Sequence, residues 1–220
     1  MRPKAYYPLF ADLNGRRCVV IGGGPVAERK VTTLLRYGAQ ITLISPAATK
    51  RLASYAKRGR IRHLQRCFRP SDLRGSWLVY AATDDERLNA LVHRTANRLR
   101  VFTNVVDQTP LCSFIAPSIV KRGALTIAVS TGGASPTLAK TLRRKLQQMI
   151  GREYAPMLRL LTNLRGVAKR KLPRYPDRKR YFDQLVRGRV FGLVRAGKHQ
   201  AAKREALSLL ECRAASHNGS

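Results

Sequence analysis

The feature that most constrains this chain is a glycine-rich turn between an apolar run and a helical pattern. Residues 18–21 are apolar and lead directly into three glycines, and Gly22, Gly24 and Ala27 fit the spacing G-x-G-x-x-G/A. This is the phosphate-binding turn of a dinucleotide-binding βαβ unit, where glycine permits a tight turn and lets a pyrophosphate approach the backbone. The following helix presents free N–H groups and a positive dipole to the phosphates. The residues expected to bind the cofactor here are Gly22, Gly23, Gly24, Pro25 and Val26.

The hydrophobic periods around the turn support this interpretation. Ala27, Val31 and Leu34 lie on one face of a predicted helix that stops near Gly38, and residues 41–44 form a second apolar run. Strand, glycine turn, helix and strand in this order predict an α/β fold with a Rossmann-type parallel sheet. The alternative is an ordinary βα turn whose glycines serve only geometry.

The ribose-binding position departs from the usual fingerprint. No acidic residue occurs between Glu28 and Asp72, where one normally takes the ribose hydroxyls. We expect Ser45, Pro46 and Ala47, which follow the second strand, to hold the ribose instead. Basic residues just beyond them, at positions 50 and 51, would tolerate a 2′-phosphate, so the residues alone do not separate NAD from NADP.

Three more strands are expected at 60–64, 77–82 and 101–106. Thr83 and Glu86 have the spacing of a capping box for the helix after the second of these strands. Thr83 and Asp84 follow the carboxyl end of that strand, which places them beside a cofactor crevice. Asp107 follows the last strand in the same way and is the candidate catalytic residue.

The pattern changes near residue 113. Two short apolar runs, 114–120 and 125–129, predict a hairpin outside the sheet, and Ser135 with Pro136 predicts the start of a helix that ends near Gly151. Residues 152–212 are mostly helical in pattern, with breaks expected at two prolines, Pro173 and Pro176. The predicted domains are a Rossmann domain over 1–113, a small dimerisation segment over 114–150, a helical C-terminal domain over 151–213 and a disordered tail over 214–220.

The loop between the hairpin and its helix is a second candidate binding element. It carries Ser130, Thr131 and Gly132, whose hydroxyls and amides precede a helix and suit carboxylates or phosphate. The alternative is a plain strand-to-helix turn.

The charge is unusually high for an α/β protein. The chain has 43 Lys and Arg against 12 Asp and Glu, a net charge of +31, and the basic excess is present in both halves. An anionic partner is one explanation, either nucleic acid or a polycarboxylate substrate, and a generally basic solvated surface is another. No nucleic-acid motif accompanies the charge, so nucleic acid is the least favoured partner.

The remaining composition excludes several classes of protein. The four cysteines fit neither a disulfide framework nor a zinc site, and the first 15 residues lack the apolar core of a signal peptide. No apolar run has the length of a membrane span. We therefore expect a cytoplasmic protein with no resident metal and no membrane partner.

Several motifs in register resemble one enzyme family, the bifunctional precorrin-2 dehydrogenases and sirohydrochlorin ferrochelatases of sirohaem synthesis. The resemblance extends over residues 6–212. The matching motifs are Tyr7-Pro-Leu-Phe10, Val20-Ile-Gly-Gly-Gly-Pro-Val-Ala-Glu-Arg-Lys30, Ala81-Ala-Thr-Asp-Asp85, Asn104-Val-Val-Asp107, Ser113-Phe-Ile-Ala-Pro-Ser118 and Ser130-Thr-Gly-Gly-Ala-Ser-Pro136.

The resemblance implies NAD-dependent oxidation of precorrin-2 to sirohydrochlorin by a homodimer, with Fe2+ as a substrate of a second reaction rather than a tightly bound cofactor. It implies that Asp107 takes part in both reactions, and that Asn104, Ser130, Thr131 and Gly132 bind the tetrapyrrole, which carries many carboxylates. A hydroxyl residue of the family's loop can carry a phosphate, and Thr131 is the matching position. Two other functions stay open: a dehydrogenase without chelatase activity, and a basic nucleic-acid-binding protein built on a Rossmann unit.

Overall fold

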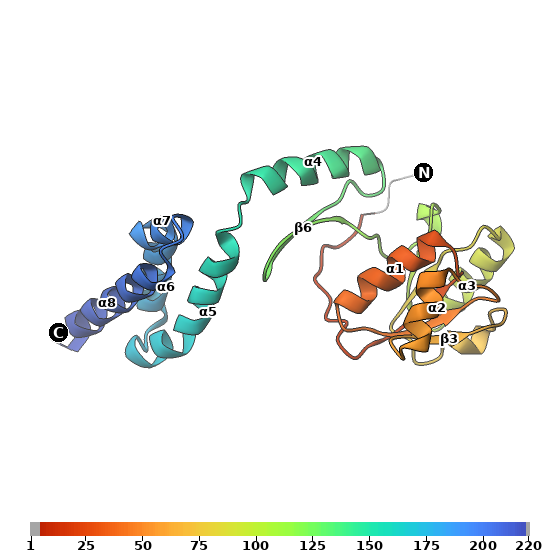
Figure 1. Ribbon diagram of the computed structural model, residues 1–220, viewed down its shortest axis with the longest axis horizontal. Coiled ribbons are helices and arrows are strands. Elements are labelled where there is room, and N and C mark those ends of the chain that lie inside the picture. Colours follow the sequence, from red (N-terminus) through yellow and green to blue (C-terminus); the bar gives the residue numbers. More distant parts are fainter. Residues whose placement is uncertain (1–4, 219–220) are drawn as a thin grey trace. The chain divides into compact units, whose positions relative to one another are not determined.

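The computed structural model describes residues 5–218, with side chains described as far as residue 215. The chain forms two compact units (Figure 1). The first contains residues up to Ala116 together with Gly132–Ala134, and the second contains Pro117–Thr131 together with the residues from Ser135 onward.

The first unit is a five-stranded parallel sheet with helices on both faces, as the glycine turn and the hydrophobic periods predict. The strand order is β3-β2-β1-β4-β5. Its elements are β1 (Arg17–Ile21), α1 (Pro25–Arg36), β2 (Gln40–Ile44), α2 (Lys50–Lys57), β3 (Arg62–Leu64), β4 (Leu78–Ala81), α3 (Glu86–Arg98) and β5 (Phe102–Val105), with short 3₁₀ turns at Pro70–Leu73 and Thr109–Leu111.

The two faces of the sheet have separate apolar cores because side chains alternate along each strand. Val20 and its neighbours on one face pack against α1 and α2, which carry Val31 and Leu52 (Figure 1). Val19 and its neighbours on the other face pack against α3, which carries Val92. All five of these valine and leucine side chains are fully buried.

The order of the strands reverses next to β1. The chain passes from β1 to β2 on one side and returns to β4 on the other, and Ile21 is level with both Ile44 and Ala81. The carboxyl ends of these three strands therefore lie at one level of one edge. In open α/β sheets, ligands bind at such a switch point.

One local prediction in this unit is wrong. Thr83 and Glu86 form no capping box, because α3 begins at Glu86 and is capped by Asp85, whose carboxylate accepts a hydrogen bond from the Leu88 N–H at 2.9 Å. The Thr83 hydroxyl instead donates to the side-chain oxygen of Asn89 at 2.9 Å. The Thr83 hydroxyl is therefore bound to the buried Asn89, one turn into α3, and Asp85 is the N-cap residue.

The second unit consists of a hairpin and five helices. The hairpin pairs β6 (Ser118–Arg122) with β7 (Leu125–Val129) in antiparallel register, as predicted. The helices are α4 (Pro136–Met149), α5 (Tyr154–Lys171), α6 (Tyr175–Arg187), α7 (Arg189–Arg195) and α8 (His199–Asn218). Ser135 caps α4 as expected, accepting from the Leu138 N–H at 3.1 Å.

The helices α5 to α8 share one apolar core around Tyr181, Leu185 and Leu210, which are fully buried. The Tyr181 hydroxyl donates to the Ala206 carbonyl at 2.8 Å, and burial raises the pKa of this phenol to about 12. A buried hydroxyl with a partner is consistent with tight packing of α6 against α8.

Two predictions in this unit need correction. Pro176 does not break a helix but lies in the first turn of α6, where a missing N–H costs nothing, whereas Pro173 does lie between helices. The predicted disordered tail is wrong as far as Asn218, because α8 continues to that residue. Alanines favour helix there, and the Arg213 guanidinium donates to the Gln184 side-chain oxygen at 2.9 Å, which ties α8 to α6. Positions 219–220 lie outside the described residues, and the four-part division into domains stays a prediction.

Within the described residues, no helix is both long and apolar enough to cross a membrane.

The fold predicts that Asp72 carries an acid-sensitive part of the stability of the first unit. Its buried carboxylate binds the Arg66 guanidinium through two hydrogen bonds of 2.7 and 2.9 Å and the Arg69 N–H through one of 2.8 Å. The hydrogen bonds from Arg66 lower the pKa of Asp72 below its ordinary value of 3.8. A lowered pKa in the folded state means that this stability is complete above pH 3.8 and is lost as the pH falls below it.

We expect Asp72→Asn to lower the free energy of unfolding at neutral pH by about 2 kcal/mol, because Arg66 loses its partner at a buried site. The difference between the variant and the wild type should shrink as the pH falls below about 4. Denaturant unfolding from pH 3 to pH 7 measures both effects. An equal difference at every pH would contradict the proposed role of the carboxylate.

Candidate functional site

The glycine turn brings three loops of the first unit into contact. A Cβ added at Gly22 would overlap the Ala82 carbonyl oxygen after β4, and one added at Gly23 would overlap the Ala47 carbonyl oxygen after β2. Gly22 also has a φ of +107°, which L-residues with side chains rarely adopt. These two glycines are therefore required by the geometry of the protein itself.

Gly24 differs from the other two. It is the N-cap residue of α1, with φ of −81°, and a Cβ built there meets nothing within 4 Å. No side chain caps α1, so the N–H groups of its first turn face the open space above Gly24. Open space beside a helix N-terminus and close to the backbone fits a pyrophosphate. Pro25, which has no N–H to offer, and Val26 begin the helix beside it.

The loop after β2 is held against the glycine turn. The Thr49 N–H donates to the Gly23 carbonyl at 3.0 Å, and His63 lies 3.0 Å from the Ser45 carbonyl through Nε2. The buried Ser45 hydroxyl donates to the Ala47 carbonyl, so its proton is used within the loop and only its lone pairs are left for a ribose. Pro46 and Ala47 are exposed next to it.

An acidic residue of α1 contacts this loop, although the usual sequence spacing predicts none here. Glu28 accepts a hydrogen bond from the Thr49 hydroxyl at 2.6 Å and lies 3.6 Å from the Arg51 guanidinium. The ion pair partly neutralises the positive charge of Arg51, which follows the predicted ribose loop. Glu28 is thus a site residue that sequence reasoning missed, although it lies inside the quoted glycine motif.

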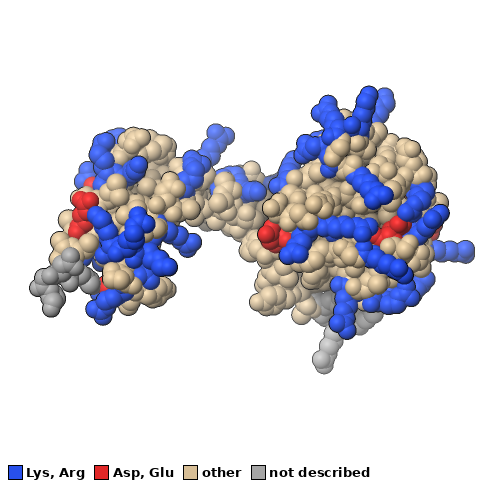
Figure 2. Space-filling view, turned by 90° about the horizontal axis from the view of Figure 1, so that it is seen from below, with Lys and Arg blue, Asp and Glu red and all other residues tan. Residues whose placement is uncertain are grey.

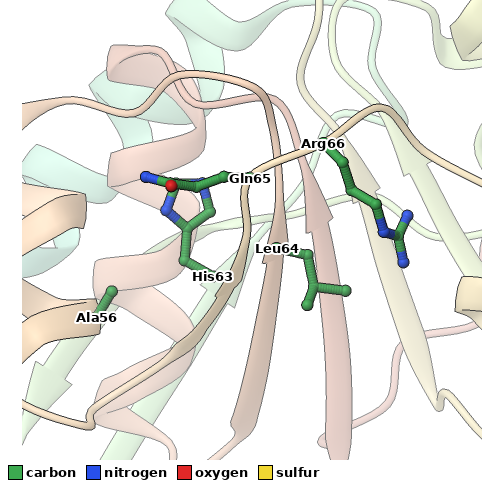
Figure 3. A pocket seen from close by; sticks show the side chains of 5 residues that line it. All are labelled: Ala56, His63, Leu64, Gln65 and Arg66. Carbon is green, nitrogen blue, oxygen red and sulfur yellow. The ribbon is translucent and has the colours of Figure 1, made fainter.

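A pocket of about 490 Å³ lies along β3, whose His63 contacts the Ser45 carbonyl of this loop. Its lining residues are Ala56, His63, Leu64, Gln65 and Arg66 (Figure 3). Figure 3 shows His63 and Gln65 on one side of the strand and Leu64 and Arg66 on the other. Because Arg66 is bound to Asp72 and His63 Nε2 contacts the Ser45 carbonyl, the polar groups still available here are His63 Nδ1 and the Gln65 amide. This pocket can receive the adenosine end of a dinucleotide held at Gly24.

The loop after β4 carries two predicted cofactor residues in different environments. Thr83 is fixed through both its hydroxyl and its carbonyl, which accepts from the Asn89 amide at 3.0 Å. Asp84 is exposed, and the structure gives it no hydrogen bond or ion pair with the described residues. Asp84 is therefore the group of this loop that is available to a ligand.

Asp107 lies two residues beyond the end of β5 with its side chain exposed. Its φ is +59°, and among the described residues only Arg100 shares a positive φ without being glycine. Aspartate tolerates this left-handed conformation better than most residues, but such positions concentrate at turns and functional sites. The turn presents the carboxylate to solvent at the carboxyl edge of the sheet.

Asn104 has a structural contact at the same edge. It is buried in β5, and its amide donates to the Phe114 carbonyl at 3.0 Å, which holds the chain as it leaves the sheet. This amide group is used by the protein, and the assignment of Asn104 to substrate binding stays a prediction.

Lys30 is the second site residue that sequence reasoning missed. It lies in the second turn of α1, with its ammonium nitrogen 4.7 Å from the centre of the Tyr80 ring. Burial lowers the pKa of Lys30, and Arg29 adds to this effect, whereas Asp107 acts in the opposite direction. The sequence could have indicated this position, because Lys30 follows the buried Ala27 by three residues and so lies on the helix face towards the sheet.

The predicted substrate loop is closed by its own hydrogen bonds. The Thr131 hydroxyl donates to the Ser135 carbonyl at 3.0 Å and accepts from the Ser135 N–H at 3.1 Å. Gly132 follows with a φ of +65°. Ser130 and Thr131 belong to the second unit, and the structure brings together on the first unit the residues predicted for the cofactor and for catalysis.

Among the described residues, no group of three or more His, Cys, Asp and Glu side chains is arranged to hold a metal ion.

Three family models match the chain in consecutive order. They are described as "Putative NAD(P)-binding" over residues 9–118, "Sirohaem biosynthesis protein central" over 122–149 and "Sirohaem synthase dimerisation region" over 153–210. The last of these lies after the segment predicted above for dimerisation, so the two assignments differ and the location of an interface stays a prediction.

Individual relatives agree with these models. The chain is 41% identical over 200 residues to siroheme synthase 1 of Pectobacterium atrosepticum, which is 91% of this chain and 42% of the relative. It is 40% identical over 206 residues to a siroheme synthase of Thioalkalivibrio sulfidiphilus, which is 94% of this chain and 42% of the relative. The chain thus spans about two fifths of the length of these relatives.

A solved structure shares the whole architecture. "SirC, precorrin-2 dehydrogenase" aligns with a TM-score of 0.77 and 25% identity, covering 93% of this chain and 98% of its own.

The contrast between the glycines gives a test of the cofactor site. We expect Gly24→Val to fold normally and to weaken NADH binding at least about tenfold, because the new side chain would enter open space where a pyrophosphate fits. Fluorescence titration with NADH measures the affinity, and thermal unfolding checks the fold.

Gly22→Val serves as the contrasting variant. Its side chain would overlap a backbone oxygen at a φ of +107°, so this protein should lose stability and not affinity alone. A stable Gly24→Val protein with the affinity of the wild type would show that the dinucleotide lies elsewhere.

Proposed function

The chain belongs to the sirohaem-synthesis family that the three consecutive models describe, and on this basis we propose that it oxidises precorrin-2 to sirohydrochlorin with NAD. In this reaction the tetrapyrrole loses one hydride to the nicotinamide and one proton to a base. The observation that carries the proposal is the match to the precorrin-2 dehydrogenase structure over nearly the full length of both chains.

The first unit supplies a site that fits the cofactor. The nicotinamide, when bound, accepts the hydride. The chain's own contribution is to bind the pyrophosphate at Gly24 and the start of α1, and to receive the adenosine end between the Ser45 loop and the pocket beside His63. NAD is favoured over NADP because Glu28 forms an ion pair with Arg51. This pair partly neutralises the charge that a 2′-phosphate of NADP would need.

Asp107 is the group that we assign as proton acceptor. Its carboxylate is exposed at the carboxyl edge of the sheet, where the cofactor crevice opens, and a turn with positive φ presents it. An ionised carboxylate at this position can take a proton from a substrate bound against the nicotinamide.

The basic surface suits a substrate with many carboxylates. Figure 2 shows Lys and Arg side chains spread over both units, with few acidic side chains between them. A positive field of this kind attracts an anionic substrate from a distance. The high charge also suggests a nucleic-acid-binding role, but no other feature of the described residues supports it. The cytoplasm stays the predicted compartment.

Insertion of Fe2+ into sirohydrochlorin is the second proposed activity. It requires loss of two pyrrole protons, and we assign Asp107 to accept them one at a time, passing the first to solvent before it takes the second, while the product stays at the site. Iron enters here as a substrate. The alternative, a dehydrogenase without chelatase activity, is separated by measuring Fe2+ insertion against the spontaneous rate.

We expect Asp107→Asn to lower the rate of NAD-dependent precorrin-2 oxidation by roughly a hundredfold or more, because the amide keeps the shape but cannot accept the proton. Absorbance of sirohydrochlorin follows the reaction. NADH affinity and the melting temperature should stay near those of the wild type, and iron insertion should fall in parallel if both reactions use this group.

Asp84→Asn is the matched control, since it removes an exposed carboxylate from the neighbouring loop. It should change NADH affinity more than it changes the rate at saturating cofactor. Near-normal oxidation by a folded Asp107→Asn protein would refute the assignment of Asp107.

The second unit is proposed to form a homodimer. Leu138, Leu142 and Met149 of α4 expose 50%, 39% and 74% of their surface, which leaves an apolar stripe uncovered. The hairpin has only two strands, so each strand has an unpaired edge. Segment 114–150 is the predicted interface.

Light scattering at micromolar protein should give twice the 24.6 kDa mass of one chain. Leu142→Glu should shift the species towards monomer, because a charge would enter the apolar contact. A monomeric wild type at these concentrations would contradict the dimer.

A further inference from the structure

A second pocket of the first unit lies at the amino edge of the sheet, opposite the edge that carries the glycine turn. It is formed where β1, β2 and β3 begin, and its volume of about 480 Å³ is within the size range of small-molecule sites. Its lining includes three arginines, Arg17, Arg60 and Arg62, and the polar residues Gln40 and Thr42. None of the described residues that line it is acidic, so the pocket is positively charged.

The strand register places four of these side chains on one face of the sheet. Arg17 is level with Gln40, and Thr42 is level with Arg62. Gln40, Thr42 and Ile44 alternate with the intervening residues of β2 and share a face, which is the face whose apolar core contains Ile44. The four polar side chains therefore lie together over the first residues of three neighbouring strands.

Arg17 is held in place without being neutralised. Its guanidinium donates to the Arg74 carbonyl at 2.6 Å and to the Asp72 carbonyl at 3.0 Å. Both acceptors are backbone groups, and no described carboxylate forms a salt bridge with Arg17. The Asp72 carboxylate is itself bound to Arg66. Because a guanidinium has five N–H donors, Arg17 keeps donors as well as its charge for a further partner.

The other polar groups of the pocket are also available. Arg60 and Arg62 are exposed, and the structure gives neither side chain a hydrogen bond or an ion pair with the described residues. Thr42 is only 8% exposed, and its hydroxyl has no hydrogen-bond partner among the described residues. A nearly buried hydroxyl that the protein leaves unpartnered is satisfied by water or by a ligand. The pocket thus combines unpaired cations with an unused neutral donor.

We propose that this pocket binds a small phosphate-bearing anion at a site separate from that of the dinucleotide. A guanidinium can bind two oxygens of a phosphate at once, and several guanidinium groups around one space suit an anion with three or more oxygens. A carboxylate has two oxygens in one plane, which a single arginine already matches. Inorganic phosphate and a phosphorylated metabolite share the required chemistry. The inference does not depend on the function proposed above.

The net charge of +31 offers a simpler explanation for any binding of anions. A diffuse positive field attracts anions to the whole surface, so the loss of any one arginine would weaken binding to a similar small extent. A built site depends on particular side chains. Arg98 provides the matched control, because it is an exposed arginine in the last turn of α3, next to β5 at the other end of the strand order.

The experiment is a calorimetric titration of the full chain with inorganic phosphate, with glucose 6-phosphate and with citrate as the carboxylate comparison. The variants are Arg62→Gln, Thr42→Val, which keeps the branched shape and removes the hydroxyl, and the control Arg98→Gln. The titrations are repeated with Gly24→Val, whose side chain would enter the opening assigned above to the dinucleotide. Melting temperatures show whether each variant is folded.

We expect at least one of the two phosphate ligands to bind more tightly than citrate, and to bind the wild type and Gly24→Val equally. Tighter binding of glucose 6-phosphate would indicate a phosphorylated metabolite, and tighter binding of inorganic phosphate the free ion. Arg62→Gln should weaken binding at least about tenfold, because a charge-assisted hydrogen bond is lost. Thr42→Val should weaken it about fivefold, because a neutral one is lost. Arg98→Gln should match the wild type.

Binding of neither phosphate ligand to the folded wild type would overturn the inference, and so would tighter binding of citrate. Equal losses in Arg62→Gln and Arg98→Gln would overturn it in favour of the diffuse charge, and loss of binding in Gly24→Val would overturn it in favour of the cofactor turn. If Thr42→Val does not fold, the comparison of Arg62→Gln with Arg98→Gln decides alone. The titrations involve neither NADH nor precorrin-2, so a failure of the proposed function would leave their outcome unchanged.

Discussion

The site on the first unit depends on the close contact between the turn after β1 and the loops after β2 and β4. Gly22 and Gly23 make this contact possible, because any side chain at either position would overlap a carbonyl oxygen of a neighbouring loop. The alignment of Ile21 with Ile44 and Ala81 brings the three loops to one level. Gly24 is then left open beside the start of α1, and the remaining polar groups of the site are arranged around that opening.

Most polar side chains near the opening are already used by the protein. Ser45, Thr83 and Asn104 each form hydrogen bonds with backbone carbonyls or with side chains of the same unit. Such bonds fix the loops, because a buried polar group without a partner would destabilise the fold. The groups left for chemistry are therefore few, and they are charged: Asp84, Asp107 and Lys30. A site in which most polar groups are fixed and a few charges are available suits proton and hydride transfer, which require defined geometry.

Acid–arginine pairs in the first unit neutralise part of the high positive charge close to the site. Among the described acids of the first unit, two pair with arginines: Asp72 with Arg66 and Glu28 with Arg51. Each pair partly neutralises an arginine beside the loop or the pocket that we propose for the adenosine end. Apart from the arginines of the pocket at the start of β1 to β3, the free basic groups remain on the outside, where they provide a long-range field and no specific contact (Figure 2).

Much of the fold could be predicted from the sequence. The apolar run before the glycines, the period of Ala27, Val31 and Leu34, and the cap at Ser135 are local signals, and the structure confirms the elements they predict. Two errors came where a side-chain hydrogen bond outside the predicted pattern decided the local structure. Asn89 binds Thr83 and removes it from the cap of α3, and Gln184 binds Arg213 and supports α8 beyond the predicted end.

The sequence by itself determined the order of strands and helices, the glycine turn and the position of Asp107 after a strand. These follow from the steric freedom of glycine and from the alternation of apolar residues, which are properties of neighbouring positions in the chain. Only the tertiary structure decided which polar groups stay available and which charges meet. The Lys30 ammonium group lies near the Tyr80 ring because α1 packs across the sheet, and no spacing within the chain encodes that approach.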